Sequence, residues 1–248
     1  MSEKYGIIGY GFVGKATELS LLDSYSVKVH DIALNTELES LENCDCVFVC
    51  IPTATDDDIT TLVSVLRDLR HVNPACTIVL RSTVPVGMCR RIQHFLDISI
   101  LYVPEFLRER SWQDDCVNST IVVGADSEVL PECFDKSRVK FCSLEEAEIL
   151  KMFNNNISAM KVVFANHFYD LCNSADASYD TVLSLHDATV HNQSYLEVSD
   201  NLRGFGGKCL TKDLDFLINT FSDYDLDQQL FSAMRDDNKK WPTTVRKS

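Results

Sequence analysis

The sequence predicts an α/β domain with a parallel sheet, followed by an all-α domain with a long central helix. Short apolar runs alternate with segments of helical periodicity over residues 1–143. Strands and helices that alternate in this way form a parallel sheet with helices on both faces. After residue 143 the pattern is helical, with one glycine-rich interruption and no clear strand. The 248 residues, 45% of them apolar, are enough to build two cores.

The first domain contains short apolar segments typical of buried strands. These segments are Tyr5–Ile8, Val27–His30, Cys46–Ile51, Thr77–Leu80, Ile98–Val103 and Thr120–Val123. Between them lie segments with helical character, namely Lys15–Leu22, Asp56–Leu69 and Met88–Leu96. The apolar residues of the second of these helices recur every three or four positions, which is the period of a helix with one buried face.

The boundary between the two domains is predicted near Ser143. Ser143 followed by Glu146 is a capping-box pattern, which marks the start of a helix. A long helix is expected from Leu144 to about Cys172. We therefore assign residues 1–143 to the first domain and residues 144–248 to the second.

Composition and charge exclude several classes of partner. The net charge of −14 repels phosphate backbones and anionic lipid surfaces, so neither a nucleic acid nor a membrane is expected as a partner. No apolar run approaches the ~20 residues that span a bilayer, and no signal peptide is recognised, so a soluble cytoplasmic protein is expected. Cys44, Cys46 and Cys50 lie in a strand-like segment without a matching Cys/His pair, so no metal site is predicted.

A glycine-rich turn follows the first strand and opens the first helix. Its glycines are Gly9, Gly11 and Gly14, and Asp31 lies at the end of the second strand. Glycine lets the backbone approach a pyrophosphate at the helix N-terminus, and the carboxylate accepts hydrogen bonds from ribose hydroxyls. This arrangement predicts a Rossmann-type dinucleotide site. Asp31 favours NAD over NADP, because a carboxylate repels the additional phosphate.

A second glycine-rich segment, residues 204–207, precedes Cys209. A cysteine at the start of a helix lies at the positive end of the helix dipole, and Lys208 and Lys212 add positive charge. Both effects lower the pKa of a thiol and favour the nucleophilic thiolate. Asp213 lies four residues further on, on the same helical face. Most cysteines are inert thiols, and it is the glycine segment and the charges that favour a nucleophile here.

Lys151 and Asn155 are spaced to share one face of the long helix. A lysine and an amide directed together at a cavity can stabilise an oxyanion. The alternative is a solvated helix face, since both residue types are mostly exposed in proteins.

These motifs together resemble the UDP-glucose/GDP-mannose dehydrogenase family, and UDP-glucose 6-dehydrogenases in particular. The matching segments follow the family's order along nearly the whole chain. They are GYGFVG at 9–14, CIPT at 50–53, STVPVG at 82–87, PEFLRE at 104–109, the Lys151/Asn155 pair within AEILKMFNN, and GFGGKCLTKD at 204–213. The predicted helix Leu226–Asn238 also resembles the segment that follows the family's cysteine motif.

The resemblance implies NAD-dependent oxidation of the primary 6-hydroxyl of a nucleotide sugar, UDP-glucose above all, to the carboxylate. Two NAD are used, and Cys209 captures the aldehyde as a thiohemiacetal that is oxidised to a thioester and hydrolysed. Lys151 and Asn155 would stabilise the oxyanion, and Asp213 would position or activate water. Thr83 would lie near the reacting hydroxyl, and Glu105 would assist proton transfer or hydrolysis.

The resemblance also implies a set of binding residues and no metal. The cofactor would be held by Gly9, Gly11, Phe12, Val13, Gly14, Asp31, Pro52, Thr53, Ser82 and Thr83. The substrate would be bound by Glu105, Phe106, Leu107, Glu109, Lys151, Gly206 and Gly207. Residues 1–143 would be the NAD-binding domain and residues 144–248 the helical dimerisation and catalytic domain.

The sequence departs from the family in three respects. Family members usually continue into a further domain that covers the nucleotide, which a separate polypeptide would have to supply here. An arginine common in the family is replaced by Gln193. Before the second glycine-rich segment, Asn201-Leu202-Arg203 occupies positions where proline and glycine are common in the family, and Arg203 is a candidate to replace the lost charge in part.

The long helix is similar to the family's dimer-forming helix, so a homodimer is expected. In it Phe164, Phe168 and Leu171 either form the interface or belong to the core.

Two other functions remain open on the sequence. One is a single-oxidation dehydrogenase of the hydroxyacid type, which shares the Rossmann domain and the Lys/Asn pair but does not need Cys209. The other is an NAD-binding regulatory protein, or a partner-dependent homologue without independent activity, because a fold alone does not establish a function.

Overall fold

The computed structural model describes residues 3–21, 26–106, 119–190, 196–206 and 209–242. The chain divides into two compact units, Met1–Lys151 and Met152–Lys247. The division lies within the long helix α5 (Leu144–Ser174), so α5 contributes to both units. The two units are described separately below.

The first unit is built on a seven-stranded sheet with the order β2-β1-β3-β4-β5-β6-β7. The strands are β1 (Lys4–Ile8), β2 (Ser26–His30), β3 (Cys46–Val49), β4 (Thr77–Leu80), β5 (Ile100–Tyr102), β6 (Ile121–Gly124) and β7 (Val139–Cys142). Neighbouring strands are parallel except β5 and β6, which meet antiparallel at Tyr102 and Gly124. The predicted α/β class is therefore confirmed, with one antiparallel pair that the sequence did not indicate.

Strand β7 was not predicted from the sequence. It is an edge strand, and its four residues VKFC are half-buried or exposed. An edge strand that is only partly buried has no need of the continuous apolar run that marks a central strand. Its neighbour β6 was predicted from the apolar run that ends at Val123, and Val123 is fully buried in the structure.

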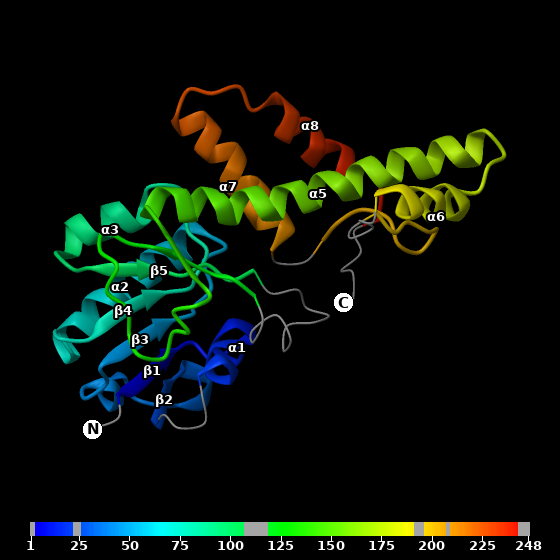
Figure 1. Ribbon diagram of the computed structural model, residues 1–248. Coiled ribbons are helices and arrows are strands. Elements are labelled where there is room, and N and C mark those ends of the chain that lie inside the picture. The colour runs from blue at the N-terminus through cyan, green and yellow to red at the C-terminus, as the bar shows by residue number, and fades with distance from the viewer. Residues whose placement is uncertain (1–2, 22–25, 107–118, 191–195, 207–208, 243–248) are drawn as a thin grey trace. The chain divides into compact units, whose positions relative to one another are not determined.

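Helices cover both faces of the sheet (Figure 1). They are α1 (Phe12–Ser20), α2 (Asp56–Val72) and α3 (Met88–Leu96), and two short 3-10 helices, η1 (Ile32–Leu34) and η2 (Leu38–Leu41), follow β2. One core cluster includes Leu62 of α2 and Ile92 of α3, and the other includes the β3 residues Cys46 and Phe48. Alternate residues of β3 face opposite sides, as the pleat of a strand requires.

The three closely spaced cysteines, Cys44, Cys46 and Cys50, do not all lie on the same face of the sheet. Cys44 packs in the cluster beneath α2 and α3, whereas Cys46 and Cys50 pack in the opposite cluster. Burial raises the pKa of all three thiols. They are therefore packed as small apolar side chains of the two cores.

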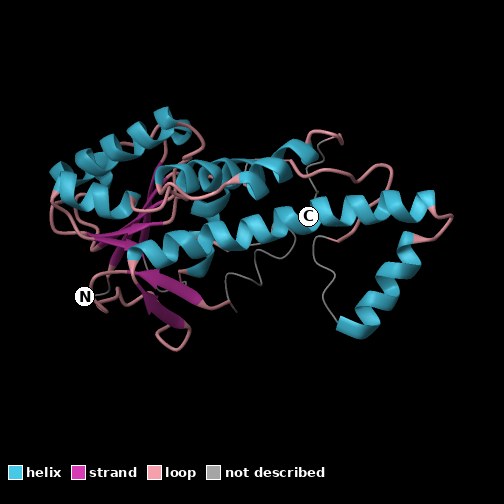
Figure 2. Ribbon diagram, turned by 90° about the horizontal axis from the view of Figure 1, so that it is seen from above, coloured by secondary structure: helices cyan, strands magenta, loops and turns pink. Residues whose placement is uncertain are grey.

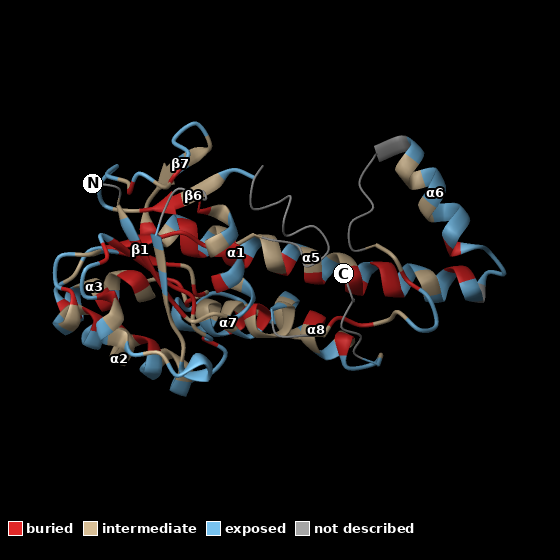
Figure 3. Ribbon diagram, turned by 90° about the horizontal axis from the view of Figure 1, so that it is seen from below, coloured by how far each residue is buried: buried red, intermediate tan, exposed pale blue. Residues whose placement is uncertain are grey.

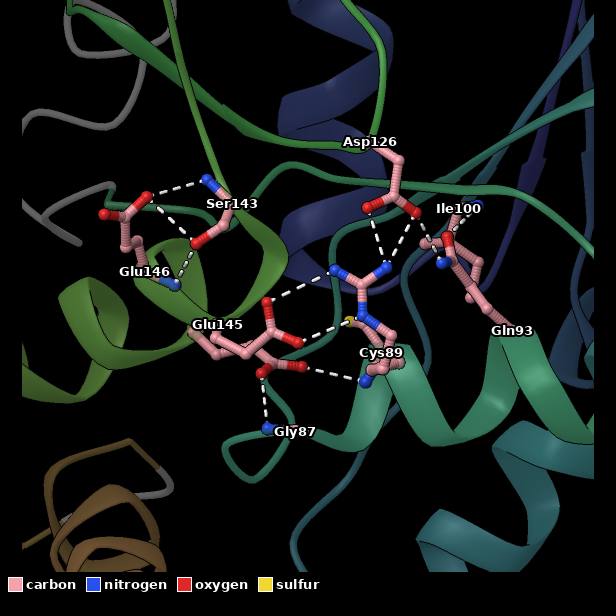
Figure 4. A network of polar contacts seen from close by, with 10 residues as sticks. Gly87, Cys89, Gln93, Ile100, Asp126, Ser143, Glu145 and Glu146 are labelled. Carbon is pink, nitrogen blue, oxygen red and sulfur yellow. Dashed lines mark hydrogen bonds and ion pairs between the residues drawn. The ribbon is translucent and has the colours of Figure 1, made fainter.

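The start of α5 has the predicted capping box. The Ser143 hydroxyl accepts a hydrogen bond from the Glu146 N–H at 3.2 Å, and the Glu146 carboxylate accepts one from the Ser143 N–H at 2.8 Å (Figure 4). These bonds satisfy N–H groups that a helix N-terminus leaves unpaired. The helix extends to Ser174, two residues beyond the predicted end.

The second unit is helical, as predicted. After α5 come α6 (Tyr179–Val190), α7 (Leu210–Asp223) and α8 (Gln229–Asn238). In the described part of this unit the only β pairing is an isolated bridge between Ser199 and Leu202, and Figure 2 shows helices joined by loops. Apolar residues of α5, α7 and α8 form one core cluster, and residues of α5 and α6 form a second. No described helix is both long and apolar enough to cross a bilayer.

Arg90 joins three elements of the first unit. Its guanidinium donates to both carboxylate oxygens of Asp126, at 2.7 and 2.8 Å, and to Glu145 at 3.1 Å (Figure 4). These contacts connect α3, the residues after β6 and the first turn of α5. The hydrogen bonds with Arg90 hold the pKa of Asp126 and of Glu145 below their usual values.

Replacing Arg90 with Met is expected to make the stability of the chain less dependent on pH. A lowered carboxylate pKa contributes stability that is complete above the unfolded value of about 4 and is lost as the pH falls through the folded value. The three side chains are 35–56% exposed, so we expect a loss of about 1 kcal/mol at pH 7, shrinking toward zero under acid conditions. Urea unfolding at several pH values measures this difference.

Arg70→Met is the matched control for this prediction. Arg70 makes a single 3.3 Å contact with Asp97, whose side chain is 96% exposed. Its removal should change the stability by less than about 0.5 kcal/mol at any pH. A wild-type advantage over Arg90→Met that stays constant between neutral and acid pH would contradict the assignment.

Candidate active site

The glycine turn after β1 brings the backbone of three segments close together. Gly9 has a φ of 87°, which favours glycine, and its N–H donates to the His30 carbonyl at 2.9 Å. A Cβ on Gly9 would lie 2.8 Å from the Cys50 carbonyl oxygen, and one on Gly14 would lie 2.1 Å from the Gly9 oxygen. Nothing lies within 4 Å of a Cβ on Gly11. Gly9 and Gly14 thus serve close packing, while Gly11 leaves space beside the start of α1.

Asp31 lies beside this turn. Its carboxylate accepts hydrogen bonds from the Tyr10 N–H at 2.6 Å and the Ala33 N–H at 2.7 Å. These bonds, the Tyr10 bond first, hold the pKa of Asp31 below its usual value. The side chain therefore presents a negative charge next to the glycine turn at neutral pH.

Exposed apolar side chains follow Asp31. Ile32 is 88% exposed and Leu34 is 52% exposed, and Phe12 at the start of α1 is 42% exposed. A group of exposed apolar side chains rimmed by polar groups is a candidate surface for contact with a ligand. Phe12 was expected at a cofactor site, but Ile32 and Leu34 were missed. The signal that could have found them is a pair of apolar residues directly after the strand-ending carboxylate.

Two hydrogen bonds join the loop after β3 to the loop after β4. The Thr53 hydroxyl donates to the Thr83 carbonyl at 2.5 Å, and the Ser82 hydroxyl donates to the Ile51 carbonyl at 2.7 Å. Thr53 and Ser82 are buried, Thr83 is half-buried, and the neighbouring Pro52 is exposed. The carboxyl ends of the strands in an open α/β sheet are the usual place for a ligand. The structure therefore brings these predicted cofactor residues to one edge of the sheet.

Glu148 binds the end of the loop that joins β4 to α3 and contains Thr83. Its fully buried carboxylate accepts hydrogen bonds from the Gly87 N–H at 2.6 Å and the Cys89 N–H at 2.8 Å. No described side chain from α3 or its flanking residues caps this helix, so Glu148 of α5 satisfies its first N–H groups. Burial raises the pKa of Glu148, although both backbone bonds act in the opposite direction. Sequence analysis missed Glu148, because its partners lie about 60 residues away.

Lys151 is a buried cation in the first unit. Its side chain is 7% exposed, its Nζ donates to the Glu105 carbonyl, and it lies 3.8 Å from the Glu105 carboxylate. The Nζ also lies 5.6 Å from the centre of the Phe106 ring, which is close enough for a cation–π interaction. The alternative of a solvated helix face is therefore wrong for Lys151. The buried charge is balanced by Glu105, which is itself 11% exposed.

The second unit contains Cys209, Asn155 and Asp213. Cys209 is exposed and occupies the cap position of α7, and its carbonyl accepts a hydrogen bond from the Asp213 N–H at 2.9 Å. The Asp213 side chain is 1% exposed; one carboxylate oxygen accepts from the Asn155 amide, and the other lies 3.5 Å from the Lys212 Nζ. Hydrogen bonds thus connect Cys209, Asp213 and Asn155, three of the residues that the sequence suggested as catalytic.

Asn156 also holds Asp213 and was missed by the sequence analysis. Its amide donates to the Met152 carbonyl at 2.9 Å and to the Asp213 carbonyl at 3.2 Å. It was missed because three asparagines stand in a row, Asn154, Asn155 and Asn156, and the sequence does not tell which amide faces the core.

Arg203 has its charge balanced within the second unit. Its guanidinium donates twice to the Asp170 carboxylate, both at 2.8 Å, and to the Asn166 side chain at 2.6 Å. It also lies 5.2 Å from the Tyr169 ring centre and 5.4 Å from that of Trp241. These contacts join the segment before Gly204 to α5.

The predicted site residues thus form two described sets, one in each unit. Gly206 is described and half-buried. Leu107, Glu109, Gln193, Gly207 and Lys208 lie outside the described residues. Within the described ranges, no group of three or more His, Cys, Asp or Glu side chains is placed to hold a metal ion.

Comparisons with known proteins cover both units. The NAD binding domain of the UDP-glucose/GDP-mannose dehydrogenase family matches residues 15–141, and the family's central domain matches residues 145–240. A UDP-glucose 6-dehydrogenase of Rickettsia conorii is 29% identical over 228 residues, which are 83% of this chain and 51% of that protein. A UDP-glucose 6-dehydrogenase of Campylobacter jejuni is 28% identical over 217 residues, which are 81% of this chain and 54% of that protein. The chain therefore spans about half the length of these curated relatives.

Solved structures share the fold. A UDP-glucose dehydrogenase from Pyrobaculum islandicum superposes with a TM-score of 0.84 at 21% identity, covering 97% of this chain and 68% of that one. A UDP-D-ManNAc dehydrogenase from Pyrococcus horikoshii superposes with a TM-score of 0.80 at 18% identity, covering 96% of this chain and 68% of that one. At these identities the likeness establishes the fold alone.

Proposed function

The chain belongs to the UDP-glucose/GDP-mannose dehydrogenase family, and we propose that it oxidises the 6-hydroxyl of a nucleotide sugar, UDP-glucose above all, to the carboxylate. The first unit matches the family's NAD binding domain, and NAD is its cofactor. The single observation that carries the proposal is the contact set around Cys209. An exposed thiol opens α7, and a buried carboxylate, Asp213, is held beside the same turn.

The residues of the first unit fit NAD. The open space at Gly11 and the start of α1 suit a pyrophosphate, whose charge a helix N-terminus favours. Ionised Asp31 suits the ribose hydroxyls, and exposed Ile32 and Leu34 suit the face of an adenine ring. Pro52, Thr53, Ser82 and Thr83 line the rest of the proposed site, together with Gly9, Phe12, Val13 and Gly14. When bound, NAD supplies the acceptor for each hydride.

We assign the nucleophile to Cys209. In the proposed reaction the first oxidation converts the primary alcohol to an aldehyde, and the Cys209 sulfur adds to the aldehyde carbon. Loss of a hydride from that carbon gives a thioester, and water then displaces the sulfur to release the carboxylate and the thiol. Covalent capture holds the aldehyde between the two oxidations. A thiol at a helix N-terminus is suited to this role, because the helix dipole favours the thiolate.

The remaining roles follow from charge and hydrogen-bonding capacity. Lys151 is a buried cation and Asn155 an amide donor, so we assign both to stabilising the oxyanion of the tetrahedral intermediates. Asp213, held by Asn155 and Lys212, is assigned to positioning the hydrolytic water. We assign Glu105 to proton transfer, and Glu105, Phe106, Leu107, Glu109, Lys151, Gly206 and Gly207 to substrate binding.

The test is the amount of NADH formed per sugar consumed. We expect two NADH for each nucleotide sugar when the chain is supplied with NAD and a panel of UDP- and GDP-sugars. One NADH per molecule would instead support a single-oxidation dehydrogenase of the hydroxyacid type. NAD binding without NADH formation from any sugar would contradict independent activity and support a regulatory or partner-dependent protein.

We also propose that the chain forms a homodimer through one face of α5. An apolar stripe on this helix is exposed in the described structure. Figure 3 shows that exposed positions occur along α5. Its members are Phe153, Ile157, Met160, Phe164, Phe168 and Leu171, which are 38–59% exposed. They recur with an 11-residue period, which keeps the stripe nearly straight along an α-helix. Phe164, Phe168 and Leu171 are thus too exposed to be ordinary core residues, and a second copy of the stripe would cover them.

Phe164→Glu is expected to convert the dimer to a monomer. A carboxylate in the middle of the stripe would have to be buried without a partner, which costs several kcal/mol per ion. Size-exclusion chromatography with light scattering measures the mass. Phe95→Glu is the matched control, since Phe95 is 69% exposed on α3 and lies apart from the stripe. A wild-type monomer, or a Phe164→Glu variant that stays dimeric, would contradict the proposed interface.

A further inference from the structure

Asn238, the last residue of α8, holds the backbone of the glycine-rich segment that precedes Cys209. Its side-chain Nδ2 donates to the Phe205 carbonyl at 2.8 Å, and its Oδ1 accepts from the Phe205 N–H at 2.7 Å. Asn238 is 6% exposed, so water does not compete for these bonds. Both backbone groups of Phe205 are therefore satisfied by one amide that lies 33 residues further along the chain.

Gly204 allows the Asn238 amide to come this close. A Cβ on Gly204 would lie 2.8 Å from the Asn238 Oδ1 and 3.3 Å from the Asn238 carbonyl oxygen. A Cβ at this position would require the Asn238 side chain to shift out of its present contact with Phe205. The glycine thus serves close packing against Asn238, and its role is distinct from that of a flexible loop residue.

The Phe205 side chain connects the backbone held by Asn238 to α7. The Phe205 side chain is 2% exposed and packs in one core cluster with Leu214 and Ile218 of α7 and Met234 of α8. Phe205 is therefore held by its backbone on α8 and by its side chain against α7. Cys209 in turn caps α7 and is bonded through its carbonyl to the Asp213 N–H.

We propose that Asn238 is a positioning residue for Cys209. It acts by holding Gly204 and Phe205, which precede Cys209 and the start of α7 in the sequence. This role rests on the proposed function, in which Cys209 is the nucleophile. Asn238 does not itself react. Its two hydrogen bonds fix the backbone of Phe205, four residues before Cys209 at the helix N-terminus, where the thiolate is favoured by the helix dipole.

The experiment measures the reactivity of Cys209 without any substrate. The full chain is treated with iodoacetamide over a range of pH, and mass spectrometry follows alkylation of the peptide that contains Cys209. Because Cys209 is exposed, its alkylation reports the thiolate and its surroundings rather than access. In Asn238→Leu we expect alkylation at neutral pH to be about tenfold slower and its pH profile to move upward, because the residues before α7 are no longer held and the helix N-terminus stabilises the thiolate less.

Asn73→Leu is the matched control. Asn73 is also 6% exposed, and its amide also holds a loop through two bonds, to the Leu41 carbonyl at 2.9 Å and the Cys44 carbonyl at 2.7 Å. It belongs to the first unit. We expect this variant to lose thermal stability like Asn238→Leu but to keep the wild-type rate and pH profile of Cys209 alkylation.

The proposal is overturned if folded Asn238→Leu keeps the wild-type alkylation rate and pH profile, or if Asn73→Leu changes them equally. Should Asn238→Leu not fold, Gly204→Ala disturbs the same contact from the other side and is judged by the same criteria. Failure of the proposed function looks different. In that case the wild type forms no NADH from any sugar, while alkylation of Cys209 still depends on Asn238.

Discussion

Cys209→Ala is expected to abolish conversion of the nucleotide sugar to the carboxylate, with a fall in turnover of about 1,000-fold or more. Without the sulfur the aldehyde cannot be captured, and no thioester forms for the second oxidation. Binding of NAD should change by less than about twofold, because the proposed cofactor residues belong to the first unit. The measurements are NADH formation, the yield of sugar carboxylate, and the dissociation constant of NAD by calorimetry.

Cys172→Ala is the matched control for the loss of a thiol. Cys172 is 7% exposed and packs in the core cluster between α5 and α6. Its removal should lower the melting temperature, because a small cavity forms in that core, but leave turnover per folded molecule unchanged. A Cys209→Ala variant that still forms two NADH per sugar would exclude the covalent mechanism.

Lys151→Met is expected to lower both turnover and the stability of the first unit. The Glu105 carboxylate would keep its buried position but lose its contact with the Lys151 charge, and removing one partner of a buried ion pair costs about 3–5 kcal/mol. Loss of the proposed oxyanion donor should lower kcat by about 100-fold or more. Urea unfolding and steady-state kinetics measure the two effects separately.

A double variant separates the two roles of Lys151. In Lys151→Met/Glu105→Gln the buried carboxylate is neutral, so most of the lost stability should return while turnover stays low. Lys140→Met is the control, since Lys140 is exposed on β7 and its loss should change stability by less than about 0.5 kcal/mol. If stability and turnover recover together in the double variant, Lys151 serves the fold and has no separate catalytic role.

Much of the architecture could be predicted because its causes are local. The glycine turn, the Ser143/Glu146 capping box and the alternation of apolar runs with helical segments each depend on residues a few positions apart. The same is true of Cys209 and Asp213, which are four residues apart at the start of one helix. Such short-range patterns are visible in the order of the residues, so the sequence determined the fold class, the starts of α2, α3 and α5, and the candidate nucleophile. The starts of α1 and α8 differ by three residues from those expected.

The tertiary structure alone decided which polar groups are buried and what they contact. Lys151 meets Glu105 across 46 positions, Glu148 meets Gly87 across 61, and Asn238 meets Phe205 across 33. From a sequence alone, a lysine, glutamate or asparagine on a helix is expected to be solvated, because these residue types are mostly exposed. They are buried here because chain segments far apart in the sequence supply their hydrogen-bond partners, and no local pattern records a partner at such a distance.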